Sequence, residues 1–582
     1  MNTASRVFFL SAILLGSVAQ SPAQVKIRNK PLTVPGEIVI KYREGRAIEA
    51  AIASLEAYGI TGIVARPRVR FVSGKIAAGR NFEQTLTACK ADPNVEYAEP
   101  NYRLYALEST PTPPVFPNDS FFGDLWNMHQ SNDNDIDAPE AWEQTTGSAN
   151  VIVGVIDTGI DYDHEDLKDN IWRNPGESGG GKENNNTDDD GNGYKDDFRG
   201  WDFINKDNDP YDDQDHGTHV AGTIGAVGNN GKGVVGVNWT VRLMPLKFLG
   251  SDGSGSTADA AAAIIYATDN GAKVLSNSWG GGGASQALKD AIQYAHDHGV
   301  LFIAAAGNDG LNTDSSPNYP SNYDVPNVVS VASNDRNDRL SSFSNYGRRT
   351  VDLSAPGSSI YSTRPLGRYQ FLSGTSMATP HVAGACALVW ARFPSLQSHQ
   401  ILARVTGTVD RKSEFIGRMS SGGRLNVFNA LGTNPIISTT TDWSNTPNTS
   451  GPYPVITIAV DDGSIARMRL VYALNGGAAD TLNMASGARD TYSADIPGQA
   501  LNTTINYSVL AADNNGNRTL GPTYSFKITS EPDPGDGGGG CCGSGAMAIE
   551  GVDDSTKYAV EVPLNIVFFL APLALLRRWR KK

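Results

Sequence analysis

The chain has little cysteine and no surplus of basic residues. Its 582 residues include four cysteines: Cys89, Cys386, Cys541 and Cys542. Adjacent cysteines rarely bridge each other and the other two are isolated in the sequence, so we expect no disulfide framework. The formal net charge of -14 argues against a nucleic-acid partner, because such a surface needs a basic face to replace phosphate counterions. The acidity favours solubility or cation binding instead.

The apolar runs near the two ends of the chain are both short for a membrane span. At the start, Arg6 precedes an apolar run at residues 7–15, and small residues continue to Ala23. This layout is typical of a secretory signal peptide, so residues 1–23 predict export from a bacterium and cleavage near Ala23.

The other run follows a glycine-rich linker at residues 531–540. It spans residues 562–576 and is followed by a basic cluster at residues 577–582, a pattern that fits a segment halted with its positive end inside the cell. We expect residues 541–582 to be a C-terminal sorting or anchoring segment. Two alternatives stay open: a sorting signal that is removed, leaving a cysteine for attachment, or a retained membrane anchor.

Between these ends the sequence divides into three segments with different patterns of predicted helices and strands, at residues 34–106, 117–431 and 434–529. Residues 34–106 predict a small α+β domain, with a strand at 36–42 and helices at 48–57 and 82–91. A proline-rich linker follows at 110–114. Residues 434–529 predict short strands between Gly, Asn and Asp turns, which is typical of an antiparallel β-sandwich. This segment resembles immunoglobulin-like or fibronectin type III modules, and either substrate binding or a spacer role is compatible with it.

The central residues 117–431 alternate apolar strands with helices. Expected strands lie at 151–156, 241–248, 273–277 and 300–306, and expected helices at 258–270 and 286–298. Strands of this kind are buried on both faces, so the fold class is α/β, a mostly parallel sheet with helices on both faces. Functional groups in such sheets gather at the carboxyl ends of strands. Asp157 and Asn308 stand at two of these ends.

Three short strings in this region carry the chemistry. Ser376 lies in a Gly-Thr-Ser turn before a small-residue helix, where by itself a helix-capping role is the ordinary interpretation. His216 begins a similar string, His-Gly-Thr-His, and Asp157 begins Asp-Thr-Gly. An acid, a base and a nucleophile therefore follow one another along the chain.

This order and these strings resemble those of the subtilisin-like serine proteases, the subtilase family. The resemblance covers residues 117–431 and implies a serine endopeptidase with a subtilisin-like fold. It implies that Asp157 orients His216 and that His216 deprotonates Ser376. It also implies that the Asn308 side chain and the Ser376 backbone N–H stabilise the oxyanion. Without the resemblance, Asn308 would be interpreted as a turn residue.

The resemblance also implies how protein or peptide substrates bind. One edge strand and a facing segment would pair with an extended peptide, and the strand ends would wall a side-chain pocket: Gly253, Ser254, Gly255, Ser278, Trp279, Gly280, Ala305 and Gly307. Asn318 stands where the family usually carries glycine at the pocket floor. We therefore expect a broad preference and leave the preferred side chain open.

An acidic insertion predicts calcium as a structural cofactor, and no organic cofactor is expected. Asp188, Asp190 and Asn192 alternate before Gly193, as oxygen ligands do in an EF-hand loop. Arg199 replaces the acid expected at the twelfth position, so Asp196 or Asp197 would complete the shell. A solvated acidic loop is the alternative. The resemblance adds a weaker second site near the start of the domain, with the candidate ligands Asp119 and Asp166.

The same resemblance implies that residues 34–106 are an inhibitory propeptide, which would be the intramolecular partner of a self-inhibited precursor. An independent binding domain is the alternative for that segment. For the whole chain, the alternative to a secreted or cell-surface protease is a catalytically inactive surface module that binds calcium or a polymer.

Overall fold

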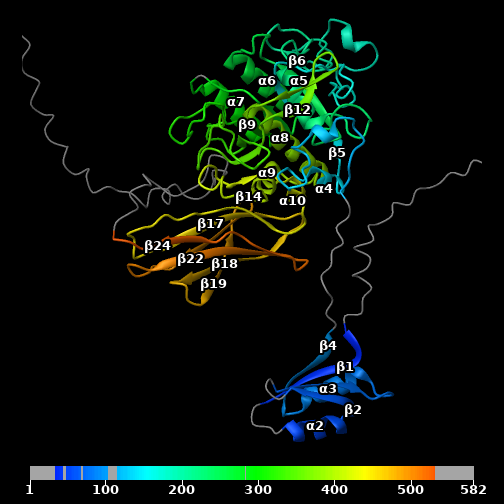
Figure 1. Cartoon of the computed structure of the whole chain (residues 1–582), viewed down its shortest axis with the longest axis vertical. Coiled ribbons are helices and arrows are strands. Elements are labelled where there is room, and N and C mark those ends of the chain that lie inside the picture. Colours follow the sequence, from blue (N-terminus) through cyan, green and yellow to red (C-terminus); the bar gives the residue numbers. More distant parts are fainter. Residues whose placement is uncertain (1–32, 44–47, 67–69, 103–113, 282, 531–582) are drawn as a thin grey trace, which may run out of the picture. The chain divides into compact units, whose positions relative to one another are not determined.

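The computed structural model describes residues 33–43, 48–66, 70–102, 114–281 and 283–530. They fall into two compact units that meet in sequence at Thr112 and Pro113 (Figure 1). The predicted signal peptide, the glycine-rich linker, the C-terminal segment and most of the proline-rich linker lie outside the described residues. No helix in the described ranges is long and apolar enough to cross a membrane.

The first unit is an antiparallel sheet with two helices. Its strands lie in the order β2 (Ile60–Arg66), β3 (Phe71–Ile76), β1 (Thr33–Tyr42) and β4 (Val95–Tyr102). The helices α2 (Ile48–Ala57) and α3 (Phe82–Ala91) have the predicted bounds. Ile38, Ile40 and Val72 from the sheet pack with Leu55 and Leu86 from the helices. The strands β2 and β3 were not anticipated from the sequence.

The second unit is built on a nine-stranded, mostly parallel sheet. In spatial order its strands are β14 (Asp410–Arg411), β15 (Gly423–Arg424), β11 (Leu353–Pro356), β10 (Val328–Asn334), β9 (Leu301–Ala305), β8 (Val274–Asn277), β5 (Gly147–Asp157), β7 (Thr240–Lys247) and β6 (Trp201–Asp202).

Helices cover both faces of this sheet. Along β5, Val153 and Val155 belong to one apolar core and Ile156 to another, because successive side chains of a strand point to opposite faces. The first core contains α5 (His216–Gly225) and α8 (Thr375–Arg392), and the second contains α6 (Thr257–Asp269) and α7 (Gln286–Asp297). The predicted α/β architecture is confirmed. The unit also contains the helices α4 (Ala138–Trp142), α9 (Ser398–Gly407) and α10 (Val427–Ala430).

Helix α8 is the central helix of the second unit and is buried along almost all of its length. A helix that is apolar on every side belongs in the interior. Its N-cap is Gly374, and Ser376 is its second residue, so Ser376 does not cap the helix. Pro380 lies inside the helix, past its first turn, so it cannot donate the helical bond to the carbonyl of Ser376; the Oγ–H of Ser278 donates to that carbonyl instead, at 2.8 Å.

A two-stranded hairpin, β12 (Ile360–Arg364) and β13 (Arg368–Leu372), packs against α5. The Ser362 Oγ–H donates to the carbonyl of His219 at 2.8 Å, and the Thr363 Oγ1–H donates to that of Thr218 at 2.7 Å. The approach is close because α5 carries Gly222 here. A Cβ atom on Gly222 would stand 2.2 Å from Thr363 Oγ1.

The C-terminal part of this unit consists of two antiparallel sheets with a shared core (Figure 1). One contains β16 (Ile436–Thr440), β17 (Tyr453–Val460), β21 (Thr491–Ile496) and β20 (Ala485–Ser486). The other contains β19 (Ala479–Asn483), β18 (Ile465–Leu474), β22 (Thr504–Asp513), β23 (Arg518–Leu520) and β24 (Tyr524–Lys527). Val455 from the first sheet and Leu470 and Val509 from the second meet in the core, as expected for a sandwich.

We predict that Gly222→Ala destabilises the second unit by about 1–3 kcal/mol, because the added methyl group would overpack the contact between α5 and β12. Urea unfolding followed by circular dichroism measures the effect. Gly123→Ala is the control, since a Cβ atom there meets no atom within 4 Å. Equal midpoints for the two variants would contradict the prediction.

Candidate active site

The candidate residues gather at the carboxyl ends of adjacent strands. Asp157 is the last residue of β5, Ser278 follows β8, and Asn308 follows β9, while β8 lies between β5 and β9 in the sheet. His216 begins α5 and Ser376 lies at the start of α8. The two helices contact each other. The parallel sheet therefore brings together groups that are far apart in the sequence.

His216 and Asp157 form a hydrogen-bonded pair. The Nδ1 of His216 lies 2.8 Å from Oδ1 of Asp157, whose carboxylate is fully buried. The backbone N–H of Thr158 also donates to this Oδ1 at 2.8 Å. A carboxylate can only accept, so Nδ1 carries the proton and Nε2 is left with an open lone pair.

The environment of His216 favours its protonated form. Burial by itself lowers the pKa of His216, but the nearby charge of Asp157 and their hydrogen bond outweigh burial, with a smaller contribution from Asp212. The net result is a pKa of His216 above that of a free imidazole.

Ser376 is held by a reciprocal contact with the end of β8. Its Oγ–H donates to the carbonyl of Ser278 at 3.0 Å, and the Oγ–H of Ser278 donates to the carbonyl of Ser376 at 2.8 Å. Among the described residues no hydrogen bond joins Ser376 to His216. Such bonds are often long or poorly aligned without substrate and tighten when substrate is bound.

Asn308 is anchored through its side-chain oxygen. Oδ1 accepts from the backbone N–H of Thr375 at 2.9 Å and from its Oγ1–H at 3.0 Å. The oxygen thus satisfies an unpaired N–H at the start of α8. Nδ2 lies 3.6 Å from the point where Gly374 would carry a Cβ atom, so the amide donor faces the turn before Ser376.

The other two histidines of the motif helices have structural partners. His219 is buried and its Nε2 lies 3.0 Å from the carbonyl of Ile360. The Nδ1 of His381 lies 2.8 Å from the carbonyl of Met377. Burial lowers the pKa of His219 to about 3 and that of His381 to about 4, so both are neutral near pH 7.

The predicted substrate-binding residues lie in two settings. Gly253, Ser254 and Gly255 form an exposed loop closed by a hydrogen bond from Gly250 N to Ser254 O at 2.9 Å, and no strand is assigned there. Ser278, Trp279 and Gly280 follow β8, Ala305 ends β9, and Gly307 lies just after β9. Asn318 lies between these walls, because Cβ atoms on Gly280 and Gly307 would each stand 3.1 Å from its Nδ2.

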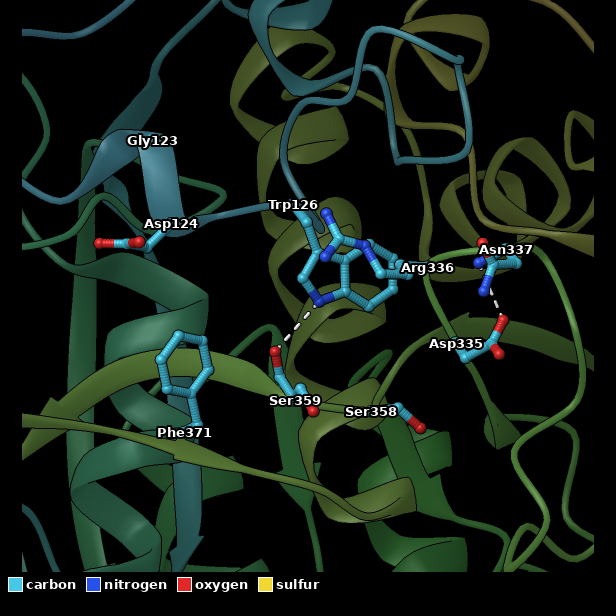
Figure 2. A pocket seen from close by; sticks show the side chains of 9 residues that line it. All are labelled: Gly123, Asp124, Trp126, Asp335, Arg336, Asn337, Ser358, Ser359 and Phe371. Atoms are coloured by element: carbon cyan, nitrogen blue, oxygen red, sulfur yellow. Dashed lines mark hydrogen bonds between the residues drawn. The ribbon is translucent and has the colours of Figure 1, made fainter.

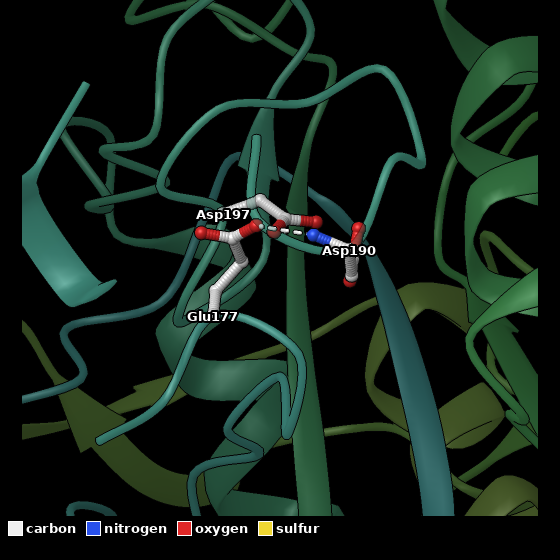
Figure 3. A group of neighbouring side chains, drawn as sticks. All are labelled: Glu177, Asp190 and Asp197. Carbon is white, nitrogen blue, oxygen red and sulfur yellow. Dashed lines mark hydrogen bonds between the residues drawn. The ribbon is translucent and has the colours of Figure 1, made fainter. Parts of the chain in front are cut away.

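The acidic insertion brings three carboxylates together: Glu177, Asp190 and Asp197. One oxygen of each lies within 4.8 Å of the others, and Figure 3 shows the three side chains converging. Glu177 and Asp197 are buried. The sequence pattern did not single out Glu177, because it precedes the alternating run and has no fixed spacing to it.

The predicted ligands Asp188 and Asp196 lie outside this cluster. Asp188 accepts three backbone N–H bonds from residues 191–193, and Asp196 accepts bonds from those of Asn185 and Asn186. Asn192 remains next to the cluster, where its Nδ2 donates to Asp197 Oδ2 at 2.8 Å. The turn of the loop therefore resembles the turn of an EF-hand, but the carboxylates that come together are not the set that the EF-hand spacing predicts.

The weaker candidates Asp119 and Asp166 both accept hydrogen bonds from the same loop, at residues 229–230. The backbone N–H of Asn229 donates to Asp119 Oδ2 at 2.7 Å, and the Asn230 side chain donates to Asp166 Oδ1 at 2.9 Å. Asp119 Oδ1 is buried without a partner. Burial raises the pKa of Asp119 to about 6, and the nearby Asp166 adds to the rise.

A separate cavity of about 450 Å³ contains none of the candidate catalytic residues. Figure 2 shows its lining, in which the Trp126 Nε1–H donates to the carbonyl of Ser359 at 3.0 Å. Ser359, which lines this cavity, donates its N–H at 2.8 Å to Oγ of Ser373, in the turn that leads to Ser376. A buried acid–imidazole pair beside a serine at a helix start is the arrangement of a serine hydrolase.

Comparisons with known proteins agree with this geometry. Residues 148–433 match the model of the subtilase family, and residues 19–101 match that of the fervidolysin N-terminal prodomain. The thermophilic serine proteinase of Bacillus sp. (strain AK1) is 35% identical over 398 residues, which cover 68% of this chain and 88% of that protein. Thermitase of Thermoactinomyces vulgaris is 38% identical over 54% of this chain and 99% of its own length. Fervidolysin of Fervidobacterium pennivorans is 30% identical over 63% of this chain and 54% of its own length.

The chain belongs to the subtilase family. It is a subtilisin-like serine endopeptidase that carries an N-terminal prodomain.

We predict that kcat/KM for peptide hydrolysis falls at acid pH with a midpoint above 6.5, the ordinary pKa of an imidazole. A general base must be neutral to act, and His216, with its raised pKa, takes up a proton at higher pH than a free imidazole does. A pH series with a chromogenic peptide measures the midpoint. Asp157→Asn is expected to lower it, and a wild-type midpoint below 6.5 would contradict the assignment.

Proposed function

We propose that this protein is an exported endopeptidase that cleaves peptide bonds through an acyl-enzyme on Ser376. The observation that carries the assignment of residues is the hydrogen bond of 2.8 Å between His216 Nδ1 and Asp157 Oδ1. It leaves Nε2 as the one ring nitrogen able to take a proton. Ser376, on the neighbouring helix α8, supplies the hydroxyl.

In the first half of the reaction, Ser376 Oγ attacks the carbonyl carbon of the peptide bond while His216 Nε2 takes the hydroxyl proton. The carbonyl oxygen becomes an oxyanion. His216 then gives the proton to the leaving amine, and the acyl group stays on Ser376. In the second half water repeats the sequence, with His216 again as the base, and the free acid leaves.

Two donors support the oxyanion in this proposal. One is Asn308 Nδ2, whose orientation is set because Oδ1 is occupied by Thr375. The other is the backbone N–H of Ser376, in the first turn of α8. First-turn N–H groups have no helical partner and lie at the positive end of the helix dipole, so both donors are in place before charge develops.

Peptide substrates would bind as an extended strand between Gly253–Gly255 and Ser278–Gly280. The loop at 253–255 is exposed. The N–H of Gly253 and both backbone groups of Ser254 already bond within the loop, so the backbone of Gly255 would make such pairing. Ala305 and Gly307 would wall the side-chain pocket together with Ser278, Trp279 and Gly280. Asn318, which lies beside Gly280 and Gly307, would add a polar group to this pocket.

The enzyme would be made as a self-inhibited precursor. The prodomain match at residues 19–101 overlaps residues 34–106, which we assign as the inhibitory propeptide of the catalytic domain at 117–431. Residues 1–23 would direct export, and residues 541–582 would provide sorting or anchoring at the cell surface of a bacterium. The sandwich at 434–529 would act as a spacer or a substrate-binding module of immunoglobulin or fibronectin type.

Calcium would stabilise the acidic insertion. Burial raises the pKa of Glu177 and of Asp197, which marks carboxylates that lack a compensating charge. Glu177 Oε2 has no partner, although its other oxygen accepts the N–H of Asp189 at 2.6 Å. Carboxylate oxygens that converge in this way suit a hard divalent cation, and Glu177, Asp190 and Asp197 would hold it. Asp119 and Asp166 would hold a second ion, with Asp119 Oδ1 as its open ligand.

The alternative of an inactive surface module is not favoured. Asp157, His216, Asn308 and Ser376 all have the residue type that the reaction needs, and the hydrogen bond between His216 and Asp157 is formed.

We predict that a serine-directed fluorophosphonate labels the mature wild-type protein and does not label Ser376→Ala, because the reagent needs the activated hydroxyl. The same variant should accumulate at precursor size if maturation is autocatalytic. In-gel fluorescence and mass spectrometry of both termini give the two readouts. A mature wild type that resists labelling would refute the protease assignment, and normal maturation of Ser376→Ala would point to a separate processing enzyme.

We predict that chelation lowers the melting temperature of the protein. At a free calcium concentration 100 times the Kd, binding adds about 2.7 kcal/mol to the free energy of unfolding, and removal of the ion by the chelator removes this contribution. In a Ser376→Ala background, which prevents self-digestion, Glu177→Gln should reduce both the calcium-dependent shift and the number of ions bound in calorimetry. Glu183→Gln in the same insertion is the control, because its Oε1 contacts only the loop backbone at Gly179. Equal shifts for the two variants would exclude Glu177 as a ligand.

A further inference from the structure

The hairpin β12–β13 contacts or continues into the three chain segments that carry Asp157, His216 and Ser376. At its tip, the N–H of Leu366 donates to Asp161 Oδ2 at 2.9 Å, in the loop that follows Asp157. At its base, Ser373 follows β13 and leads into Ser376. Along its length it packs on α5, which begins at His216.

The contact nearest His216 is an ion pair. Arg364, the last residue of β12, places Nε 2.8 Å and Nη2 2.6 Å from Asp215 Oδ2. Asp215 directly precedes His216. About a third of the Arg364 side chain is exposed, so the pair lies at the rim of the site. No other ion pair of Asp215 or Arg364 occurs among the described residues.

The backbone at Asp215 needs such support. Its φ is 120°, in the region that favours glycine, and a non-glycine residue there stores strain that its surroundings must hold. Its side chain does not cap α5, and Arg364 is the group that fixes it. The N–H of Asp215 donates to Asp212 Oδ1 at 3.0 Å, so Asp212 holds the backbone of this strained residue and Arg364 holds its side chain, directly before His216.

The acidic side chains near His216 each have a hydrogen-bond or ion-pair partner. Asp157 accepts a hydrogen bond from the Nδ1–H of His216, and Asp212 accepts an O–H bond from Thr158 and N–H and O–H bonds from Thr218. Asp213 pairs with Lys247 at 2.6 Å. His219 on the next turn is neutral because burial lowers its pKa to about 3. Asp215 is the remaining acid, and Arg364 is its only compensating charge among the described residues.

We propose that Arg364 is a positioning residue, whose ion pair with Asp215 ties the His216 end of α5 to the hairpin that leads into Ser376. The proposal rests on the proposed function above, since it concerns the alignment of its base and nucleophile. Arg364 itself touches neither reacting group.

Loss of Arg364 should lower kcat and leave KM unchanged, because the peptide-binding segments do not contact this pair. A misplacement of about 1 Å can cost 10²-fold, and we expect Arg364→Gln to lower kcat by about 10- to 100-fold. The acid midpoint of kcat/KM should rise as well, because an uncompensated carboxylate beside His216 favours its protonated form.

The experiment uses the mature enzyme and counts active sites with the fluorophosphonate, so that kcat refers to folded enzyme. The variants are Arg364→Gln, Arg364→Lys and the double variant Arg364→Gln with Asp215→Asn. Arg368→Gln is the matched control, because Arg368 lies on the same hairpin and its Nε donates only to the carbonyl of Pro365. A chromogenic peptide gives kcat, KM and the pH profile.

The proposal expects low kcat and a raised acid midpoint for Arg364→Gln, an intermediate kcat for Arg364→Lys, and a midpoint restored to the wild-type value in the double variant. A merely structural role would not give that restoration. If Arg364→Gln fails to fold, Arg364→Lys and the double variant decide by the same criteria. Values equal to those of Arg368→Gln overturn the proposal while the protease assignment stands. A wild type that neither labels nor hydrolyses the peptide refutes the protease assignment instead.

Discussion

The hydrogen bond between His216 and Asp157 is the interaction on which the rest of the site depends. A fully buried carboxylate at the end of β5 is costly unless it is paired. Here the pairing fixes the tautomer of the imidazole, and it raises the pKa of His216 against the effect of burial. The parallel sheet makes this possible, because it brings a buried strand end to the N-terminus of a helix. The proposed role of His216 as the base for Ser376 depends on that geometry.

The start of α8 is the second constraint. Its first N–H is taken by Asn308 Oδ1, and Ser376 exchanges two hydrogen bonds with Ser278. Each contact comes from the end of a different strand, so the helix is located by the sheet and not by its own capping. The same groups that locate the helix leave Asn308 Nδ2 and the Ser376 N–H as donors. The contacts that locate the helix therefore also orient the two donors of the proposed oxyanion site.

The hairpin β12–β13 lies outside the main sheet and contacts the helix that begins at His216. It approaches α5 closely at Gly222, and it neutralises Asp215 through Arg364. The acidic insertion follows the opposite logic, since it buries Glu177 and Asp197 without an opposing side-chain charge. In one place the protein supplies the opposing charge itself, and in the other three carboxylates lie close together.

The fold class, the bounds of helices such as α2 and α3, and the candidate residues Asp157, His216 and Ser376 could be predicted from the sequence, because local periodicity and short strings are properties of neighbouring residues. The tertiary structure sets which groups meet. It made Ser376 the second residue of α8 with Gly374 as its cap, and it brought Glu177 into the acidic cluster in place of Asp188. Arg364 and Asp215 are 149 residues apart. No local pattern reports such a contact, since it exists only when the sheet and the hairpin have packed.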